Sequence, residues 1–338
     1  MFPPVNLCLE ACLAAMDAVG IDGAVIDEFP PSGVRLDNGV LRCAYRASEE
    51  AVRRHPSRFA YVGRIDPADP DMERLIAETR SHPGRLGLRV DQPPAAIFAS
   101  GGYRPFFTVA ARHGVPVWTV LPGRLPELVP YLEAFPDLRV VVDHAGMLER
   151  GDNDPARPFH SLDALLALAR YPNVAVKWGH VTEWSHEPFP YGDALRQLRR
   201  VLDAFGSKRV MWESDWTQCL GHQTLAEMLF SIRLADLLSP EEKADVLGRT
   251  TLAVMGWERT EDRVDTILVA PGDWDAFSAR LKQAGQLLHG GVAIRRLGED
   301  AARGARTVST APAGPDTRQV SVAQAAEAAL YGRIAGSR

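Results

Sequence analysis

The chain has 338 residues, more than a typical single domain of about 100–200, although (β/α) barrels commonly reach about 250 as one domain. Hydrophobic residues make up 46% and charged residues 24%, values typical of a globular protein, which exclude a disordered chain. The net charge of −5 argues against a nucleic-acid-binding protein with a basic stripe. No apolar run approaches the roughly 18 residues of a membrane span, and the first residues lack the basic segment of a secretory signal.

Cysteine usage favours a reducing compartment. Cys8, Cys12, Cys43 and Cys219 form no CxxC pair and have no zinc-finger spacing. Cys8 and Cys12 would share one helix face, where we interpret them as small buried apolar residues. We therefore expect a cytoplasmic protein. From its net charge and the lack of a long apolar run, we expect it to bind neither nucleic acid nor membrane.

Short β-rich runs alternate with helical segments along most of the chain, which predicts βαβ units and a parallel sheet. The predicted elements in chain order are helix 7–19, strand 23–27, helix 48–56, strand 59–66, helix 71–82, strand 86–90, helix 103–114, strand 115–121, helix 125–135, strand 138–146, helix 160–172, strand 174–179, helix 191–206, strand 209–216 and helix 239–257. Ser239 and Glu242 form a predicted capping box at the start of the last helix.

The seven predicted strands are one short of a closed (β/α)8 barrel, and a doubly wound open sheet is the structural alternative. The strands are nearly continuous apolar runs, as in a sheet covered on both faces. No GxGxxG follows the first strand, so a dinucleotide-binding version lacks support.

Residues 258–338 differ in composition and carry no recognisable motif. We predict strands at 265–270 and 291–297, helices at 273–289 and 322–334, and a linker at 310–317. The predicted domains are therefore a barrel over 1–257 and an accessory region of unknown role over 258–338.

Polar side chains follow most of the predicted strands, and in a β/α barrel the chemistry lies at these strand ends. Such a rim suits acid–base or metal chemistry and an anionic substrate. The residues are Asp27, Glu28, Arg64, Asp66, Arg89, Asp91, Trp118, Thr119, Asp143, His144, Lys177, His180, Glu213 and Asp215.

Four of these residues have specific candidate roles, each with a structural alternative. Asp215 would bind a divalent metal or take a proton from water, or else cap a helix or pair with an arginine. His144 would ligate a metal or orient a carbonyl, or else form a hydrogen bond under a loop. Arg89 would hold a substrate carboxylate and Lys177 an anion, although either would equally form a structural ion pair.

The histidines at 180, 186 and 222 are weaker candidates, because solvated loop histidines have the same pattern. Glu213 alternates with Asp215, so both side chains are expected on one side of the strand.

Three segments together resemble the amidohydrolase-related family of (β/α)8 barrels, which includes dicarboxylate lactonases, sugar lactonases and metal-dependent decarboxylases. They are VVVDHAGM at 140–147, VAVKWG at 174–179 and RVMWESDW at 209–216, and LEACLAAMDAVGIDGAVI at 9–26 also resembles the family's first helix and second strand. The likeness covers roughly residues 7–257.

The resemblance implies roles by position. His144 would be the active-site histidine of strand six and Asp215 the strand-eight aspartate that activates water or binds metal. Arg89 would contact a substrate carboxylate, and Lys177 would be the strand-seven lysine. The implied cofactor is a divalent metal, Zn or Mn. Arg64, Trp118 and His180 complete the candidate substrate-binding set.

Departures from the family pattern lower the number of expected metal ligands. The HxH motif of the family's first strand occurs nowhere in the chain, and Trp118 stands where decarboxylases present a histidine, which favours a lactonase-like hydrolase. Glu213 replaces a usual glycine and Thr217 a usual proline. His144 and Asp215 alone are fewer ligands than a zinc site needs. Metal-free hydrolysis, with Asp215 as general base and Arg89 and His144 polarising a carbonyl, is an alternative.

A barrel without its first strand would expose two unpaired edges. The expected explanations are an N-terminally truncated gene model, a partner that fills the gap, or closure by residues 265–270 as a permuted first strand beside strand eight.

The predicted fold is thus a (β/α)8 TIM-type barrel missing its usual first strand, with a small α+β accessory region. The predicted function is a hydrolase acting on a small carboxylated lactone, ester or amide. The alternatives are a metal-dependent decarboxylase of the same fold, and a non-catalytic subunit that pairs with an intact homologue. The expected assembly is a homo-oligomer or a hetero-oligomer with a related barrel.

Overall fold

The computed structural model describes residues 9–29, 31–147, 154, 156–216 and 223–259, and the strands at 266–269 and 293–296. The chain divides into two compact units. The described residues of Val25–Arg259 belong to the first unit, and those of Leu7–Ala24 and Thr260–Arg338 belong to the second. Among the described helices, none combines the length and hydrophobicity needed to cross a membrane.

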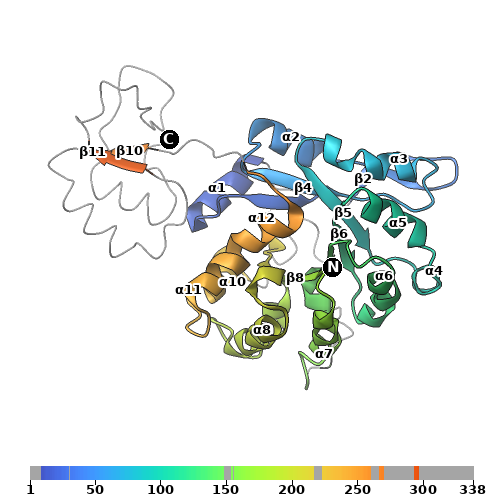
Figure 1. Cartoon of the computed structure of the whole chain (residues 1–338). Helices are drawn as coiled ribbons and strands as arrows, with labels where there is room; N and C mark the ends of the chain where they lie inside the picture. Colours follow the sequence, from blue (N-terminus) through green and yellow to red (C-terminus); the bar gives the residue numbers. More distant parts are fainter. Residues whose placement is uncertain are drawn as a thin grey trace, which may run out of the picture. The chain divides into compact units, whose positions relative to one another are not determined.

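The first unit is built on a curled, parallel seven-stranded sheet, as in a TIM-type barrel (Figure 1). The seven strands predicted from the sequence are all present, in the order β1-β4-β5-β6-β7-β8-β9. Their bounds are β1 Ala24–Asp27, β4 Phe59–Gly63, β5 Arg85–Asp91, β6 Val117–Val120, β7 Val140–Val142, β8 Val174–Trp178 and β9 Val210–Trp212.

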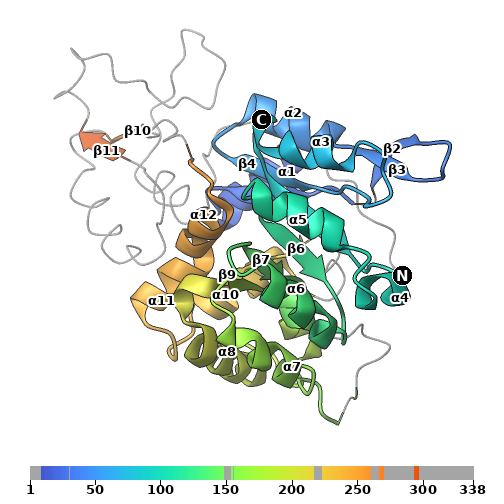
Figure 2. The ribbon, with the colours of Figure 1, turned by 45° about the vertical axis from the view of Figure 1, so that its right-hand side comes forward.

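Helices lie on the outside of the curled sheet (Figure 2). Each predicted helix of this unit is present, and α4 and α10 are additional. The bounds are α2 Arg46–Arg54, α3 Met72–Ala77, α4 Ala95–Ala99, α5 Arg104–Arg112, α6 Val129–Ala134, α7 Leu162–Leu166, α8 Gly192–Phe205, α10 Leu225–Arg233, α11 Pro240–Ala244 and α12 Thr250–Met255. The capping box of Ser239 and Glu242 is confirmed at the start of α11.

Two apolar clusters form because strand side chains alternate between the faces of the sheet. The outer cluster joins strand residues such as Val142 and Val176 to helix residues such as Phe107. The inner cluster surrounds Trp118 and includes Met255 at the end of α12. Full burial of each such side chain contributes about 1.5–3 kcal/mol to the stability of the fold. This packing holds the strand ends in place.

A β-hairpin between β1 and α2 was not predicted. It consists of β2 Ser32–Arg35 and β3 Leu41–Ala44, antiparallel, with Ser32 opposite Ala44. The strands are short and β2 is exposed, so they lack a hydrophobic pattern. The pair Asn38–Gly39 was the available signal, because this dipeptide favours hairpin turns.

In the second unit, α1 Leu9–Val19 is a helix as predicted. Strand β10 Thr266–Val269 pairs in parallel with β11 Ala293–Arg296, in a separate two-stranded sheet. The expectation that residues 265–270 close the barrel is therefore wrong, because their described backbone is paired with β11 and not with β1 or β9. The helices predicted at 273–289 and 322–334 and the linker at 310–317 lie outside the described residues, as do Thr217 and His222.

Candidate active site

Three neighbouring strand ends carry residues in the left-handed backbone region. His144 (φ 50°) and Ala145 (φ 51°) lie in the turn Asp143–Gly146 after β7, His180 (φ 59°) follows β8, and Asp215 (φ 40°) follows β9. This conformation costs a non-glycine residue roughly 1–2 kcal/mol. Such strain is typical of functional sites, where the surrounding structure holds the side chains in place.

These turns bring two imidazoles and one carboxylate together. His180 Nε2 is hydrogen-bonded to Asp215 Oδ2, and His144 Nε2 lies 3.7 Å from the same oxygen. The two imidazole rings are 4.5 Å apart and meet at 63°. The structure therefore brings together His144 and Asp215, the two residues on which the predicted site most depends, and adds His180 to them.

A second carboxylate orients His180. Glu183, in the 3₁₀ turn Val181–Trp184, places Oε1 3.1 Å from His180 Nδ1, and its side chain is only 8% exposed. His180 Nε2 is thereby directed towards Asp215 and His144. The sequence reasoning missed Glu183, and its spacing of three residues from His180 was the available signal.

The local environment sets the charges of this cluster. Burial lowers the pKa of His144 to about 4, so its imidazole is neutral at pH 7. Burial alone would raise the pKa of Asp215, but the hydrogen bond from His180 and the nearby imidazoles lower it to about 2. Asp215 is therefore a carboxylate at neutral pH.

The cluster has the donor set of a divalent metal site. Ligand atoms of His144, His180 and Asp215 lie within 4.8 Å of one another. Two histidines and one carboxylate are ligands that zinc sites use, and the other nitrogen of a ligating histidine commonly faces a carboxylate, as His180 Nδ1 faces Glu183. The two-residue metal site expected from the sequence thus gains a third donor, and the residues fit a catalytic metal.

A row of buried charges lies beside this cluster. Asp143 Oδ1 is 2.5 Å from Lys177 Nζ, and Asp143 Oδ2 is 3.1 Å from an Arg89 guanidinium nitrogen. Lys177 Nζ also contacts Glu213 Oε2 and lies 4.0 Å above the Trp118 ring centre. Burial opposes ionisation of Asp143, but the charges of Arg89 and Lys177 outweigh it and hold its pKa well below the usual range.

The row continues towards β1 and β4. Arg89 contacts Asp27, and Arg64 lies 2.6 Å from the other oxygen of Asp27. Cationic side chains and carboxyl groups therefore alternate from Arg64 through Asp27, Arg89, Asp143 and Lys177 to Glu213. Arg64 also lies 3.5 Å from Asp91, so each of the three cationic side chains contacts two carboxyl groups.

Arg89 and Trp118, two of the predicted substrate-binding residues, are almost fully buried. The Arg89 side chain is 9% exposed and held between Asp27 and Asp143. Trp118 is 3% exposed and lies beneath Lys177, where its indole N–H donates to Met255 Sδ at 3.0 Å.

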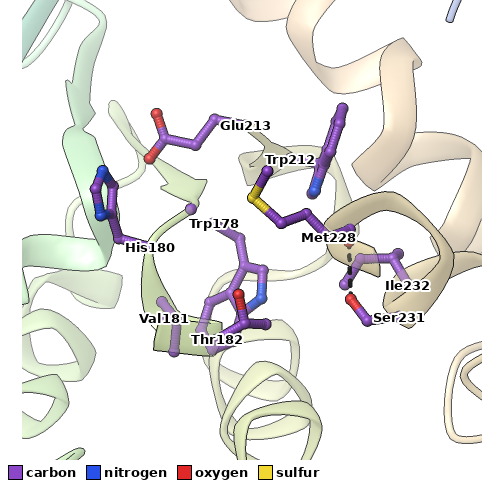
Figure 3. A pocket seen from close by; sticks show the side chains of 10 residues that line it. Trp178, His180, Val181, Thr182, Trp212, Glu213, Met228, Ser231 and Ile232 are labelled. Carbon is purple, nitrogen blue, oxygen red and sulfur yellow. Dashed lines mark hydrogen bonds between the residues drawn. The ribbon is translucent and has the colours of Figure 1, made fainter. Parts of the chain in front are cut away.

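A small pocket adjoins the cluster (Figure 3). His180 and Glu213 line one end of it, and Met228 and Ile232 line the other. The rest of its lining is Trp178, Gly179, Val181, Thr182, Trp212 and Ser231.

A family model described as amidohydrolase matches residues 4–257. The chain belongs to the amidohydrolase family. A segment of 139 residues in this amidohydrolase is 36% identical to L-fucono-1,5-lactonase from Burkholderia ambifaria. That alignment covers 38% of this chain and 45% of the lactonase, so the chain matches less than half of that relative's length.

Solved structures share the fold. A zinc-bound amidohydrolase from Burkholderia multivorans has a TM-score of 0.57 at 23% identity and covers 74% of this chain and 89% of its own. A probable 2-pyrone-4,6-dicarboxylic acid hydrolase from Acinetobacter baumannii, with citric acid bound, has a TM-score of 0.57 at 16% identity, covering 76% and 92%. The manganese-bound 5-carboxyvanillate decarboxylase of Novosphingobium aromaticivorans has a TM-score of 0.52 at 17% identity, covering 73% and 80%.

Proposed function

We propose that this amidohydrolase hydrolyses a small carboxylated lactone, ester or amide at the rim formed by His144, His180 and Asp215. The observation that carries the proposal is the approach of both imidazoles to one oxygen of Asp215 from three adjacent strand ends. The partial likeness to a lactonase supports the choice of a lactone among these substrates.

The side chains have complementary roles in this proposal. The carboxylate of Asp215 takes a proton from the water as the water oxygen bonds to the carbonyl carbon, and returns that proton to the leaving oxygen or nitrogen as the acyl bond breaks. His180 holds Asp215 in place. The neutral ring of His144 orients the substrate carbonyl. His144, His180 and Asp215 would hold a divalent metal, Zn or Mn, which when bound polarises a carbonyl and lowers the pKa of a bound water.

The proposal that the substrate carries a carboxylate depends on Arg64, Arg89 and Lys177. Arg89 and Lys177 both contact Asp143, the residue before His144, and Arg64 contacts the same Asp27 as Arg89, so these positive charges would attract a carboxylate. The carboxylates that share these cations weaken this attraction. Turnover of a carboxylated lactone, compared with that of a matched uncharged lactone, therefore tests separately whether the substrate carries a carboxylate.

We also infer that β1 and β4–β9 are seven consecutive strands of the eight in a TIM-type barrel. Support comes from the sheet order, in which β1 and β9 are end strands without a described partner between them. A strand from a partner chain at these edges would complete the barrel.

The test is an assay of the purified protein with zinc, with manganese and with EDTA. The substrates are carboxylated lactones, uncharged sugar lactones, esters, amides and aromatic carboxylic acids, with acid release and carbon dioxide both measured. Lactone opening at a rate well above background supports the proposal. Carbon dioxide release without hydrolysis would establish the decarboxylase alternative. Inactivity on every substrate, together with co-purification of a second barrel chain, would establish the subunit alternative.

A further inference from the structure

Glu213 has a place in the fold that the proposed chemistry does not use. It follows β9, its side chain is 8% exposed, and both of its carboxyl oxygens are engaged. Oε1 accepts a hydrogen bond from the backbone N–H of His144 at 3.0 Å, and Oε2 contacts Lys177 Nζ. Glu213 thus joins the strained turn after β7 to the lysine of β8.

The His144 turn needs such support. Three consecutive residues, His144, Ala145 and Gly146, have positive φ angles of 50°, 51° and 65°. Two of them carry a side chain, so the turn is held against an intrinsic preference for other conformations. Lys177 contacts both Asp143, the residue before His144, and Glu213, whose other oxygen accepts the hydrogen bond from the His144 N–H, so one ammonium group holds both residues.

Gly179 makes room for Glu213. A Cβ atom at position 179 would lie well under 3.0 Å from Cγ and Cδ of Glu213, closer than real Cβ contacts come. The backbone of Gly179 is not in the left-handed region, so alanine there acts through this contact and not through backbone strain. The observed position of the Glu213 carboxyl therefore depends on glycine at 179.

We propose that Glu213, seated over Gly179, is a positioning residue that fixes the His144 imidazole beside Asp215 by holding the backbone N–H of His144. Loss of the carboxyl, or its displacement by a methyl group at 179, releases this turn. The His144 ring then leaves its place 3.7 Å from Asp215. The kinetic consequence rests on the proposed function, whereas the positioning itself does not.

The test is a double-mutant cycle of Glu213→Ala and Gly179→Ala, with Glu213→Gln as the conservative variant and Gly248→Ala as the control. A Cβ at Gly248 meets no atom within 4 Å, so this control adds a methyl group without a contact. The primary readout is amide hydrogen exchange of the His144 N–H, and urea unfolding reports global stability in parallel. Isothermal titration with zinc chloride is the second readout.

We expect exchange at His144 to be faster by about fivefold or more in Glu213→Ala and in Gly179→Ala, as for loss of one hydrogen bond. Glu213→Gln retains an acceptor and should stay near the wild-type rate. Gly179→Ala should add nothing in the Glu213→Ala background, because both changes remove the same contact. Zinc affinity should fall about tenfold or more in the two disruptive variants, as for loss of a residue that orients a ligand.

Unchanged exchange at His144 in Glu213→Ala would overturn the inference, and so would independent, additive effects of the two substitutions. Equal acceleration of many amides, matched by lower global stability, would also overturn it by showing a general structural role. Absence of zinc binding in the wild type would count against the metal site of the proposed function, and the exchange cycle would still decide the role of Glu213.

Discussion

His180 and Asp215 are 35 residues apart in the sequence, and His180 Nε2 is hydrogen-bonded to Asp215 Oδ2 across the ends of β8 and β9. Both residues adopt positive φ angles, so two strained turns are held in place facing each other. Glu183 holds the far nitrogen of His180 at 3.1 Å. Asp215 thus has a fixed orientation, which a catalytic carboxylate requires.

Replacement of Asp215 by asparagine should abolish turnover and preserve the fold. The amide retains an oxygen to accept a hydrogen bond from His180 but does not take a proton from water, so we expect kcat to fall by about 10²–10⁴-fold. Steady-state kinetics and circular dichroism measure the two effects. Asp91→Asn at the same rim is the control, because Asp91 lies outside the donor cluster. An unimpaired Asp215→Asn enzyme would rule out this carboxylate as the base.

Replacement of His180 by alanine should weaken metal binding. One of three described donors is lost, and we expect the affinity for zinc or manganese to fall by about 100-fold or more, because even the loss of a residue that only supports a ligand costs about 10–100-fold. Isothermal titration of EDTA-treated protein measures this change. His186→Ala is the matched control, because His186 is an exposed histidine six residues away. Equal affinities in the two variants would exclude His180 as a ligand.

The stability of the protein should fall between pH 6.5 and pH 8. Burial and the adjacent Asp143 raise the pKa of Glu213 to about 8, so the folded state retains a proton that the unfolded state releases. The free energy of unfolding then decreases with rising pH by up to about 1.4 kcal/mol per pH unit. Burial lowers the pKa of His144 to about 4, which makes the free energy of unfolding increase with rising pH. This opposite effect acts only below about pH 6.5, the ordinary pKa of histidine.

Urea unfolding of wild type and Glu213→Gln, both with EDTA, measures this pH dependence. Glutamine does not titrate, so the variant should lack the decline attributed to Glu213. Parallel curves for the two proteins above pH 6.5 would show that Glu213 has an ordinary pKa.

Replacement of Asp143 by asparagine should strongly destabilise the fold. Asp143 is fully buried between Arg89 and Lys177, and its loss leaves two buried cations with one partner fewer. We expect a loss of about 3–5 kcal/mol in the free energy of unfolding, the usual cost of breaking a buried ion pair. Asp91→Asn should cost about 1 kcal/mol or less, because its contact with Arg64 is longer and more exposed. Similar urea midpoints for the two variants would contradict this view of the charge row.

The sequence determined the elements of the barrel because their signals are local. Apolar runs such as Val140–Val142 specify buried strands, and the Ser239 and Glu242 pair specifies a helix start within four residues. The hairpin β2–β3 and the pairing of β10 with β11 were missed. The hairpin lacks a buried face, and the choice of a strand partner depends on distant segments that periodicity does not identify.

The sequence also determined which residues stand at the rim, because parallel strands present their carboxyl ends together. It identified His144, His180 and Asp215 there but could not rank His180 above other loop histidines. Only the tertiary structure decided the side-chain partners. Arg89 pairs with Asp27, 62 residues away in the sequence, because the order of the strands in the sheet separates β1 from β5 by β4 alone.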